Sequence, residues 1–305
     1  MKFSGSSKHR AGFTLVELLV AMSVTIILLG VLVYLTGVSM DTYRKSRNEV
    51  RASRQAKDAL ETIAKDLESM VFRRDGNAYE WLYAGAEPLG LEGPGSETIS
   101  NTRQLIFFTG ATDRYNGQIG TADDNGGDVS AVCYRLVYRD QISGNDDYAV
   151  FSLYRHLLNP DDAFDLLATN DLKQASTSIF NDAQDLTAEN FLVENIYEFT
   201  ITFLVEYKDN NLTRIERVSL TEGGNYDEFR LRGNQLLVGP DDVTASSAES
   251  RLLAGRIIGA EVSVTVLTDR GLAIAKNTEL PGDRWKDELR KHSYHYTKSI
   301  TTPRP

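Results

Sequence analysis

The stretch that decides the fold is GFTLVELLVAMSVTIILLGVLV, residues 12–33, close to the start of the chain. After Gly12 it contains 21 residues, Phe13 to Val33, with a single charge at Glu17. A helix of that length is about 30 Å long, at about 1.5 Å per residue, which equals the thickness of the hydrocarbon core of a bilayer. The sequence therefore predicts one membrane-spanning helix, to which we assign residues 13–38.

The leader before the span, MKFSGSSKHRAG (residues 1–12), contains Lys2, Lys8 and Arg10 and no acidic residue. Because basic flanks stay in the cytoplasm, the sequence predicts a single-pass protein with a cytoplasmic N-terminus and an extracytoplasmic head at the bacterial cytoplasmic membrane. A cleaved secretory signal peptide is the alternative. It fits less well, because the apolar run is longer than a usual signal core and no small-x-small cleavage site lies near its end.

Glu17 is unusual inside a span. An ionised carboxylate there costs on the order of 3 kcal/mol, so such a residue usually has a partner and a role. Glu17 stands four residues after Phe13, which follows Gly12 directly. A cut between Gly12 and Phe13 would create a new ammonium group at the membrane depth of a neighbouring subunit's Glu17, and the two charges would neutralise each other. The alternative is a plain membrane anchor with an incidental glutamate.

The order of residues from Gly12 to Glu17, GFTLVE, resembles the type IV prepilin processing motif, since it follows a short basic leader and precedes a long apolar helix. The family includes type IV pilins and the pseudopilins of type II secretion. The resemblance implies that a prepilin peptidase cuts after Gly12 and methylates the amine of Phe13. It also implies that Glu17, the fifth residue of the mature chain, meets the N-terminal amine of an adjacent subunit. The chain departs from many major pilins in having Gly30 and Gly37, and no proline, in the second half of the span.

The helix is predicted to continue to Phe72, because no proline or glycine occurs between Asp41 and Phe72. Residues 39–75 are assigned as an amphipathic spine, since apolar residues recur at steps of three and four at Ala52, Ala56, Ala59, Leu60, Ile63, Leu67 and Val71. Basic residues gather before this stripe, at Arg44, Lys45, Arg47, Arg51 and Arg54. We interpret them as a solvated neck, with binding to anionic lipid or nucleic acid as the alternative.

Residues 76–280 are predicted to form an α+β globular head. Gly76–Ser96 is rich in glycine and proline and is interpreted as a connector. Strand-type runs follow at Arg103–Thr109, Val132–Tyr138, Tyr148–Leu157, Phe191–Tyr207 and Arg256–Thr268. Val132–Tyr138 alternates as a half-buried strand does, and Tyr148–Leu157 is expected to pair with it as a hairpin. The predicted fold is a long N-terminal helix packed on a mostly antiparallel sheet.

The order of these strands resembles the J-class minor pseudopilins and related large minor pilins, which implies a pilin-like fold. The last residues, 281–305, are predicted to form a flexible tail, because they show little core signal.

Charge argues against a general nucleic-acid binder. The chain of 305 residues has 33 basic and 43 acidic side chains, a formal net charge of −10, whereas phosphate backbones require clustered Lys and Arg. A nucleic-acid binder would need a local basic and aromatic patch, for which Trp285–Tyr296 is the one candidate. The single cysteine, Cys133, excludes an internal disulfide and a Cys-based zinc site, and we interpret it as a packed small residue.

No motif predicts a cofactor or catalysis. Thr121–Asp128 places Asp123, Asp124 and Asp128 around two glycines, which suits calcium, but its spacing is not that of an EF-hand and a solvated turn is preferred. His292 and His295 have a spacing that helical metal sites use, but they lie in the predicted tail, and His156 is interpreted as structural. The chain shows none of the common catalytic motifs, so we predict that it is not an enzyme.

The sequence therefore predicts a structural minor pilin or pseudopilin of a type IV pilus or a type II secretion pseudopilus, assembled at or near the fibre tip. Its implied partners are other pilin or pseudopilin subunits, the prepilin peptidase and an assembly platform in the cytoplasmic membrane. Two alternatives remain. One is a DNA-uptake or adhesive minor pilin, for which Trp285–Tyr296 is the candidate patch, and the other is an unprocessed membrane-anchored ectodomain.

Overall fold

A computed structural model of the chain describes residues 14–72, 79–86, 102, 104–110, 127–140, 148–181, 185–210, 212–220, 225–276 and 284–303. The chain divides into two compact units, Met1–Val50 and Arg51–Pro305, and each is described by itself.

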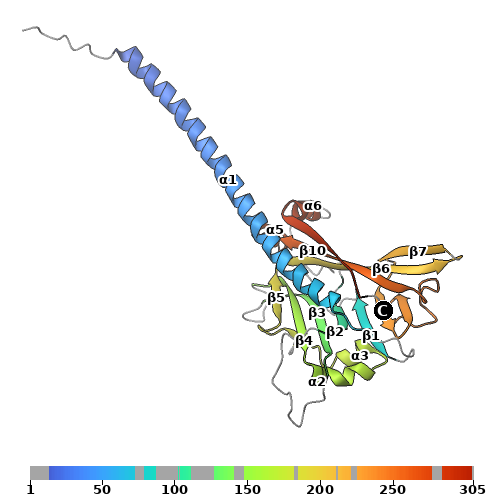
Figure 1. The fold of residues 1–305 in the computed structure, drawn as a ribbon. Helices are drawn as coiled ribbons and strands as arrows, with labels where there is room; N and C mark the ends of the chain where they lie inside the picture. Colours follow the sequence, from blue (N-terminus) through green and yellow to red (C-terminus); the bar gives the residue numbers. More distant parts are fainter. Residues whose placement is uncertain are drawn as a thin grey trace, which may run out of the picture. The chain divides into compact units, whose positions relative to one another are not determined.

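The long helix α1 (Leu15–Glu68) begins in the first unit and continues into the second (Figure 1). Within the first unit its apolar side chains are exposed all around the helix, as a surface that faces lipid requires. Among the described residues, α1 is the one helix that is long and apolar enough to cross a membrane. Helix α1 ends at Glu68, four residues before the predicted end at Phe72. It ends there because the backbone turns and pairs with a β-strand: the Val71 N–H donates to the Phe108 carbonyl at 2.9 Å.

The second half of α1 lies in the core of the second unit. Its buried apolar residues are Ala52, Ala56, Ala59, Leu60, Ile63, Ala64 and Leu67, which confirms the predicted stripe up to Leu67. They form one apolar cluster with side chains from two β-sheets, such as Phe107, Tyr134, Phe203 and Val264. Four of these helix positions are alanines, and such small side chains allow the helix to approach the sheets closely.

The larger sheet has seven antiparallel strands in the order β5-β4-β3-β2-β1-β8-β9. The strands are β1 (Glu80–Gly85), β2 (Gln104–Thr109), β3 (Ser130–Arg139), β4 (Val150–Leu158), β5 (Phe191–Glu194), β8 (Glu228–Arg232) and β9 (Gln235–Gly239). The predicted hairpin between the second and third strand-type runs is confirmed by the pairing of β3 with β4, in which Leu136 lies opposite Leu153.

The smaller sheet has four antiparallel strands in the order β11-β10-β6-β7. They are β6 (Ile196–Asp209), β7 (Leu212–Ser219), β10 (Arg256–Leu267) and β11 (Ser293–Ile300). Alternate residues of β10 point into the core, among them Val262, Val264 and Val266. A long N-terminal helix packed on mostly antiparallel sheets is the α+β, pilin-like architecture that the sequence predicts.

Short helices cover the other face of the larger sheet. These are α2 (Pro160–Ala163), the 3-10 helix η2 (Phe164–Ala168) and α3 (Leu172–Ser176). Their side chains Leu166 and Leu172 form a second apolar cluster with Trp81, Ile106 and Cys133 of the sheet. Strand β3 is therefore buried on both faces, and the prediction of a half-buried strand is wrong. The sequence pattern did not show that short helices cover its second face.

The predicted connector Gly76–Ser96 contains a strand. β1 lies between β2 and β8 in the sheet, and all six of its residues are buried. Its sequence, EWLYAG, is a short apolar run whose flanking glycines and prolines concealed it, so the interpretation of the whole segment as a connector is wrong.

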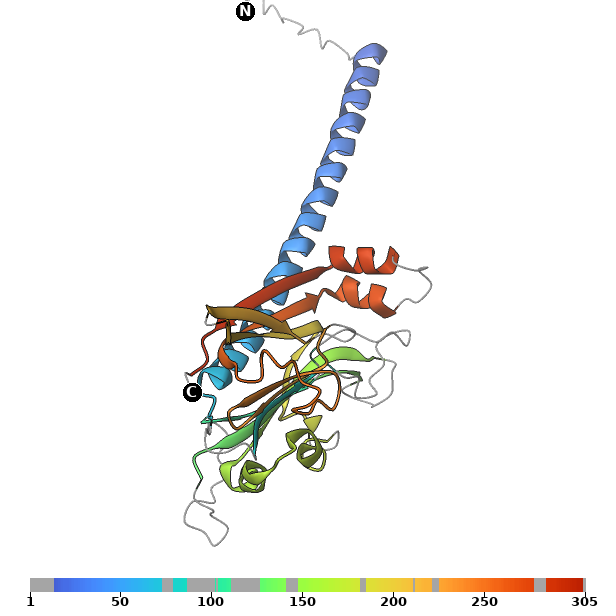
Figure 2. The ribbon, with the colours of Figure 1, turned by 90° about the vertical axis from the view of Figure 1, so that its right-hand side faces the viewer.

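The prediction of a flexible tail is also wrong for the residues described between 284 and 303. β11 pairs with β10 along its whole length, from Ser293 opposite Leu267 to Ile300 opposite Ala260. Tyr294 and Tyr296 pack against the core on one face of β11. Helices α5 (Asp269–Lys276) and α6 (Arg284–Lys291) lie side by side at one end of this sheet (Figure 2). The alternation typical of a strand was present in the sequence of β11, but the polar residues of its outer face made the segment resemble a tail.

Candidate processing and assembly site

The predicted processing residues Gly12 and Phe13 lie outside the described residues. The first described residue is Thr14, and α1 begins directly after it at Leu15. Thr14 therefore occupies the N-cap position of the helix, and Glu17 occupies its third helical position.

Thr14 and Glu17 form a reciprocal capping box. Glu17 Oε2 accepts hydrogen bonds from the backbone N–H and the hydroxyl of Thr14, each at 2.9 Å, and Thr14 Oγ1 accepts from the Glu17 N–H at 3.3 Å. The first N–H groups of a helix have no partner within it, and a capping box satisfies two such donors at once. The T-x-x-E pattern at residues 14–17 was readable in the sequence, but the sequence analysis missed it.

In this geometry one of the two oxygens of the Glu17 carboxylate, Oε1, is available to a partner outside the helix. In the described part of the chain, Oε1 makes no hydrogen bond, whereas Oε2 serves the start of its own helix. The positive end of the helix dipole also favours a negative charge at this position. Glu17 can therefore cap α1 and still accept a hydrogen bond from an external cation.

Asp66 is a second notable carboxylate on α1, and sequence analysis missed it as well. Its side chain is fully buried. Asp66 Oδ2 accepts from Tyr134 Oη at 2.5 Å and from Arg155 Nε at 2.7 Å, and Oδ1 accepts from Arg155 Nη2 at 2.9 Å. The forked contact with Arg155 joins α1 to β4, and the contact with Tyr134 joins it to β3. Burial, followed by the charge of Asp66, raises the pKa of Tyr134 well above its ordinary value, so its hydroxyl keeps the proton that it donates.

Cys133 has the neighbours of a catalytic cysteine but not its electrostatics. On adjacent strands it lies directly opposite His156, whose Nδ1 is 2.8 Å from Asp185 Oδ1. The thiol is 1% exposed, and its burial, followed by the charge of Asp185, raises its pKa well above the ordinary value. A thiol kept protonated and covered is a poor nucleophile. The interpretation of Cys133 as a packed small residue is confirmed.

Cys133 is therefore expected to resist alkylation. Iodoacetamide at neutral pH should leave it unmodified in the folded protein and modify it fully in denaturant, as measured by mass spectrometry. A Tyr148→Cys variant is the control, because Tyr148 is 74% exposed and a thiol there should react in the folded state. Equal labelling of Cys133 and of the cysteine at position 148 would contradict the burial argument.

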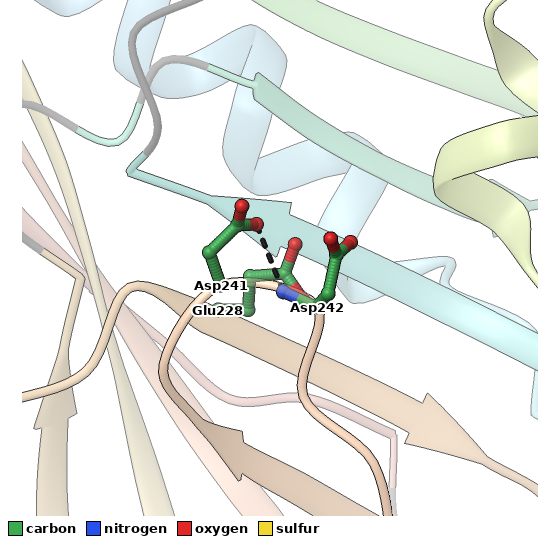
Figure 3. A group of neighbouring side chains, drawn as sticks. All are labelled: Glu228, Asp241 and Asp242. Carbon is green, nitrogen blue, oxygen red and sulfur yellow. Dashed lines mark hydrogen bonds between the residues drawn. The ribbon is translucent and has the colours of Figure 1, made fainter.

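A cluster of three carboxylates resembles a cation site. The carboxylate oxygens of Glu228, Asp241 and Asp242 lie within 4.8 Å of one another (Figure 3). However, Lys173 Nζ donates to all three, at 2.9 Å to Glu228, 2.6 Å to Asp241 and 3.3 Å to Asp242. Arg230 Nε donates to the other oxygen of Glu228 at 2.9 Å. The ammonium group of Lys173 thus occupies the place that a metal ion would take.

The two remaining metal candidates are the calcium segment and the pair of histidines. Of the calcium segment Thr121–Asp128, only Gly127 and Asp128 are among the described residues. His292 lies between α6 and β11, whereas His295 lies within β11, so the two histidines do not share a helix. His295 Nδ1 is 3.1 Å from the Thr265 hydroxyl on the neighbouring strand.

Comparison with known proteins agrees with the N-terminal features. The family model described as the prokaryotic N-terminal methylation motif matches residues 7–33, a range that includes Gly12, Phe13 and Glu17. Searches of curated proteins and of solved structures gave no match. The chain thus carries a type IV prepilin-like signal. Such a signal implies interaction with a prepilin peptidase and with pilin-type subunits, and together with the apolar half of α1 it fits a membrane-anchored protein.

Proposed function

We propose that this protein is a structural minor subunit, a minor pilin or pseudopilin, of a type IV pilus or a type II secretion pseudopilus. It is made with residues 1–12 in the cytoplasm and its head outside the cytoplasmic membrane, is cut after Gly12 and is methylated on Phe13. The observation that carries the proposal is the methylation motif at residues 7–33, which runs directly into α1. The α+β head that follows the helix also agrees with it.

The geometry at the start of α1 supports a role for Glu17 in assembly. Cleavage after Gly12 leaves a positively charged N-terminus one residue before the Thr14 cap. Because an ionised carboxylate in lipid costs on the order of 3 kcal/mol, Glu17 gains from a cation at its free Oε1. The N-terminus of a neighbouring subunit, which lies at the same membrane depth, supplies that cation. The same contact, repeated between neighbours, orders the helices of a fibre.

We also propose a structural and not a catalytic role, at or near the fibre tip. The one cysteine is covered, and the clustered carboxylates Glu228, Asp241 and Asp242 are already paired with Lys173. The head is large, with 255 residues after Val50, and a terminal position requires fewer neighbours to fit around it than a position inside a helical fibre.

The DNA-uptake alternative receives less support. Its candidate patch Trp285–Tyr296 divides between α6 and β11, and Tyr294 and Tyr296 pack against the core. Aromatic side chains that are used for packing cannot stack on bases, and binding to single strands requires such stacking beside a basic groove.

Analysis of the N-terminus tests the proposal. Protein isolated from its native membrane should begin with methylated Phe13, because the peptidase removes residues 1–12. A Gly12→Val variant should accumulate as precursor, since a bulky side chain would stand at the cut bond. Ala11→Val, the same enlargement at the preceding residue, is the matched control and should be processed. Mature material that begins at Met1 would favour the unprocessed ectodomain.

A further inference from the structure

Strand β7 is an outer strand of the smaller sheet, and one of its two edges has no partner strand among the described residues. β6 occupies the other edge along the whole length of β7, from Asp209 opposite Leu212 to Thr202 opposite Ser219. Figure 1 shows the two strands as a hairpin at the periphery of the head. A free edge presents a row of backbone N–H and C=O groups to which a further strand can add.

The pairing of β7 with β6 determines which backbone groups face the free edge. In an antiparallel pair, residues that exchange both hydrogen bonds with the partner strand alternate with residues whose N–H and C=O point away from it. The Leu220 N–H donates to the Ile201 carbonyl at 3.3 Å, one pair beyond the end of β7, so residues of even number belong to the bonded set. The residues whose backbone groups point outward are therefore Thr213, Ile215, Arg217 and Ser219. Within the described ranges these groups make no backbone hydrogen bond.

The other outer strands of the head are less suited to strand addition than β7. The outer edge of β9 is covered, because the Leu236 N–H donates to the Leu253 carbonyl at 3.0 Å. In addition, the Val238 carbonyl accepts from the Glu249 N–H at 2.9 Å. β5 has only four residues, and β11 contains Lys298, a residue type that discourages pairing at sheet edges. β7 has eight residues and contains neither lysine nor proline.

The arginines of β7 do not protect its edge, because both are paired within their own sheet. Arg214 forms a salt bridge with Asp209 of β6 at 3.2 Å, and Arg217 donates to Glu261 of β10 at 2.6 Å. Their charges are therefore already balanced, and an approaching strand needs no excess of acidic residues.

The side chains of β7 also expose apolar surface. Leu212 and Ile215 are each 61% exposed, and they are two of the five large apolar residues that are exposed in the described part of the head. Because their positions differ by three, they lie on opposite faces of the strand. A strand added at the free edge would have a side chain beside each of them.

We propose that β7 binds an extended segment of a different pilin-type subunit by strand addition. The added strand bonds to the outward backbone groups of β7 and extends the four-stranded sheet by one strand. It has apolar residues at two positions three apart, because Leu212 and Ile215 have that spacing on opposite faces of β7. The contact joins one head to one neighbour and does not repeat, as a minor subunit near the fibre tip requires. This inference rests on the proposed fibre function and names the surface of contact.

Photo-cross-linking in native membranes tests this contact. In the full-length chain a benzophenone side chain replaces Thr213, one of the residues whose backbone faces the free edge. Irradiation should join the chain to a second protein, and mass spectrometry should show that this protein has a prepilin-type N-terminal motif of its own. The control carries the benzophenone at Tyr148, which is 74% exposed but precedes β4 of the larger sheet, and should not give this product. An equal yield from the control, a product with a second copy of this chain, or one with a protein that lacks the motif would overturn the inference.

Proline at position 215 distinguishes strand addition from other contacts of the same surface. Ile215→Pro removes an outward N–H but no hydrogen bond to β6, so the head should still fold while the yield of the cross-link falls at least about tenfold. Ile215→Val keeps the N–H and a branched apolar side chain, and it should retain the product. Ile215→Lys places a charge at the edge and should also lower the yield, which provides a second variant if the proline disturbs the hairpin.

Two further measurements make the outcome decisive. Urea unfolding followed by the fluorescence of Trp81 shows whether each variant is folded. A yield that both Ile215→Pro and Ile215→Lys leave unchanged would sink the proposed contact. The N-terminus is determined in the same samples, so processing after Gly12 without the cross-link overturns this inference and leaves the fibre function standing, whereas a chain that still begins at Met1 overturns the fibre function itself.

Discussion

Asp66→Ala is expected to lower the free energy of unfolding of the head by about 3–5 kcal/mol, because it removes from the buried guanidinium of Arg155 the carboxylate that accepts two of its hydrogen bonds. Arg155 is 5% exposed and Tyr134 is fully buried, so water cannot replace the lost carboxylate without opening the core. Urea unfolding of the detergent-solubilised full chain measures the change, and the fluorescence of Trp81, which lies in the second apolar cluster, reports it.

Asp58→Ala is the matched control for this prediction. Asp58 lies two turns earlier on the same helix and is exposed, so its removal should change the unfolding free energy by less than about 0.5 kcal/mol. A double variant, Asp66→Leu with Arg155→Met, should lose less than Asp66→Ala alone, because neither charge remains to be buried. Asp66→Ala with a loss below 1 kcal/mol would mean that the Asp66–Arg155 pair does not hold α1 on the sheet.

Glu17→Ala is expected to leave cleavage after Gly12 intact and to reduce incorporation into the fibre by about 100-fold. This factor follows from the cost of an ionised carboxylate in lipid, which is on the order of 3 kcal/mol and which pairing with a cation offsets. Each factor of ten corresponds to about 1.4 kcal/mol. Comparison of sheared fibres with the membrane fraction by immunoblot, with the N-terminus sequenced from both, measures the effect.

Because Glu17 also caps α1, a control variant is needed that preserves the hydrogen bonds at the start of the helix. Glu17→Gln preserves an acceptor for the Thr14 N–H, since glutamine also serves in capping boxes, but it removes the charge. If pairing with a neighbour's N-terminus is the role of Glu17, the glutamine variant should fail as the alanine variant does. Normal incorporation of Glu17→Gln would reduce Glu17 to a helix cap. Thr14→Val completes the set, because it removes the capping hydroxyl and keeps the carboxylate.

The features that the sequence predicted well have a local cause. The span follows from an uninterrupted apolar run, and the buried face of α1 follows from alanines and leucines at helical spacing. β3 and β4 pair as expected because each has enough apolar residues to identify it. The capping box of Thr14 and Glu17 is equally local and was available to the same reasoning.

The features that the sequence concealed depend on contacts between distant residues. Asp66 appears as an acid beside an apolar stripe, and its partners Tyr134 and Arg155 lie 68 and 89 residues further along the chain. β1 is too short to stand out between glycine-rich segments. β11 reads as a polar tail until β10 supplies its hydrogen-bonding partner, so its tyrosines had no visible core to enter. In each case a long-range neighbour determines the structure.

The continuity of α1 has a mechanical consequence. A pull on the apolar end of this one helix is transmitted along its axis to Asp66, and the ion pair of Asp66 with Arg155 passes that load to β4, which lies next to the edge strand β5 of the larger sheet. There the load is shared among the hydrogen bonds that pair β4 with β3. Force on the apolar end of α1 is therefore carried by many hydrogen bonds of the head together and does not separate its strands one bond at a time.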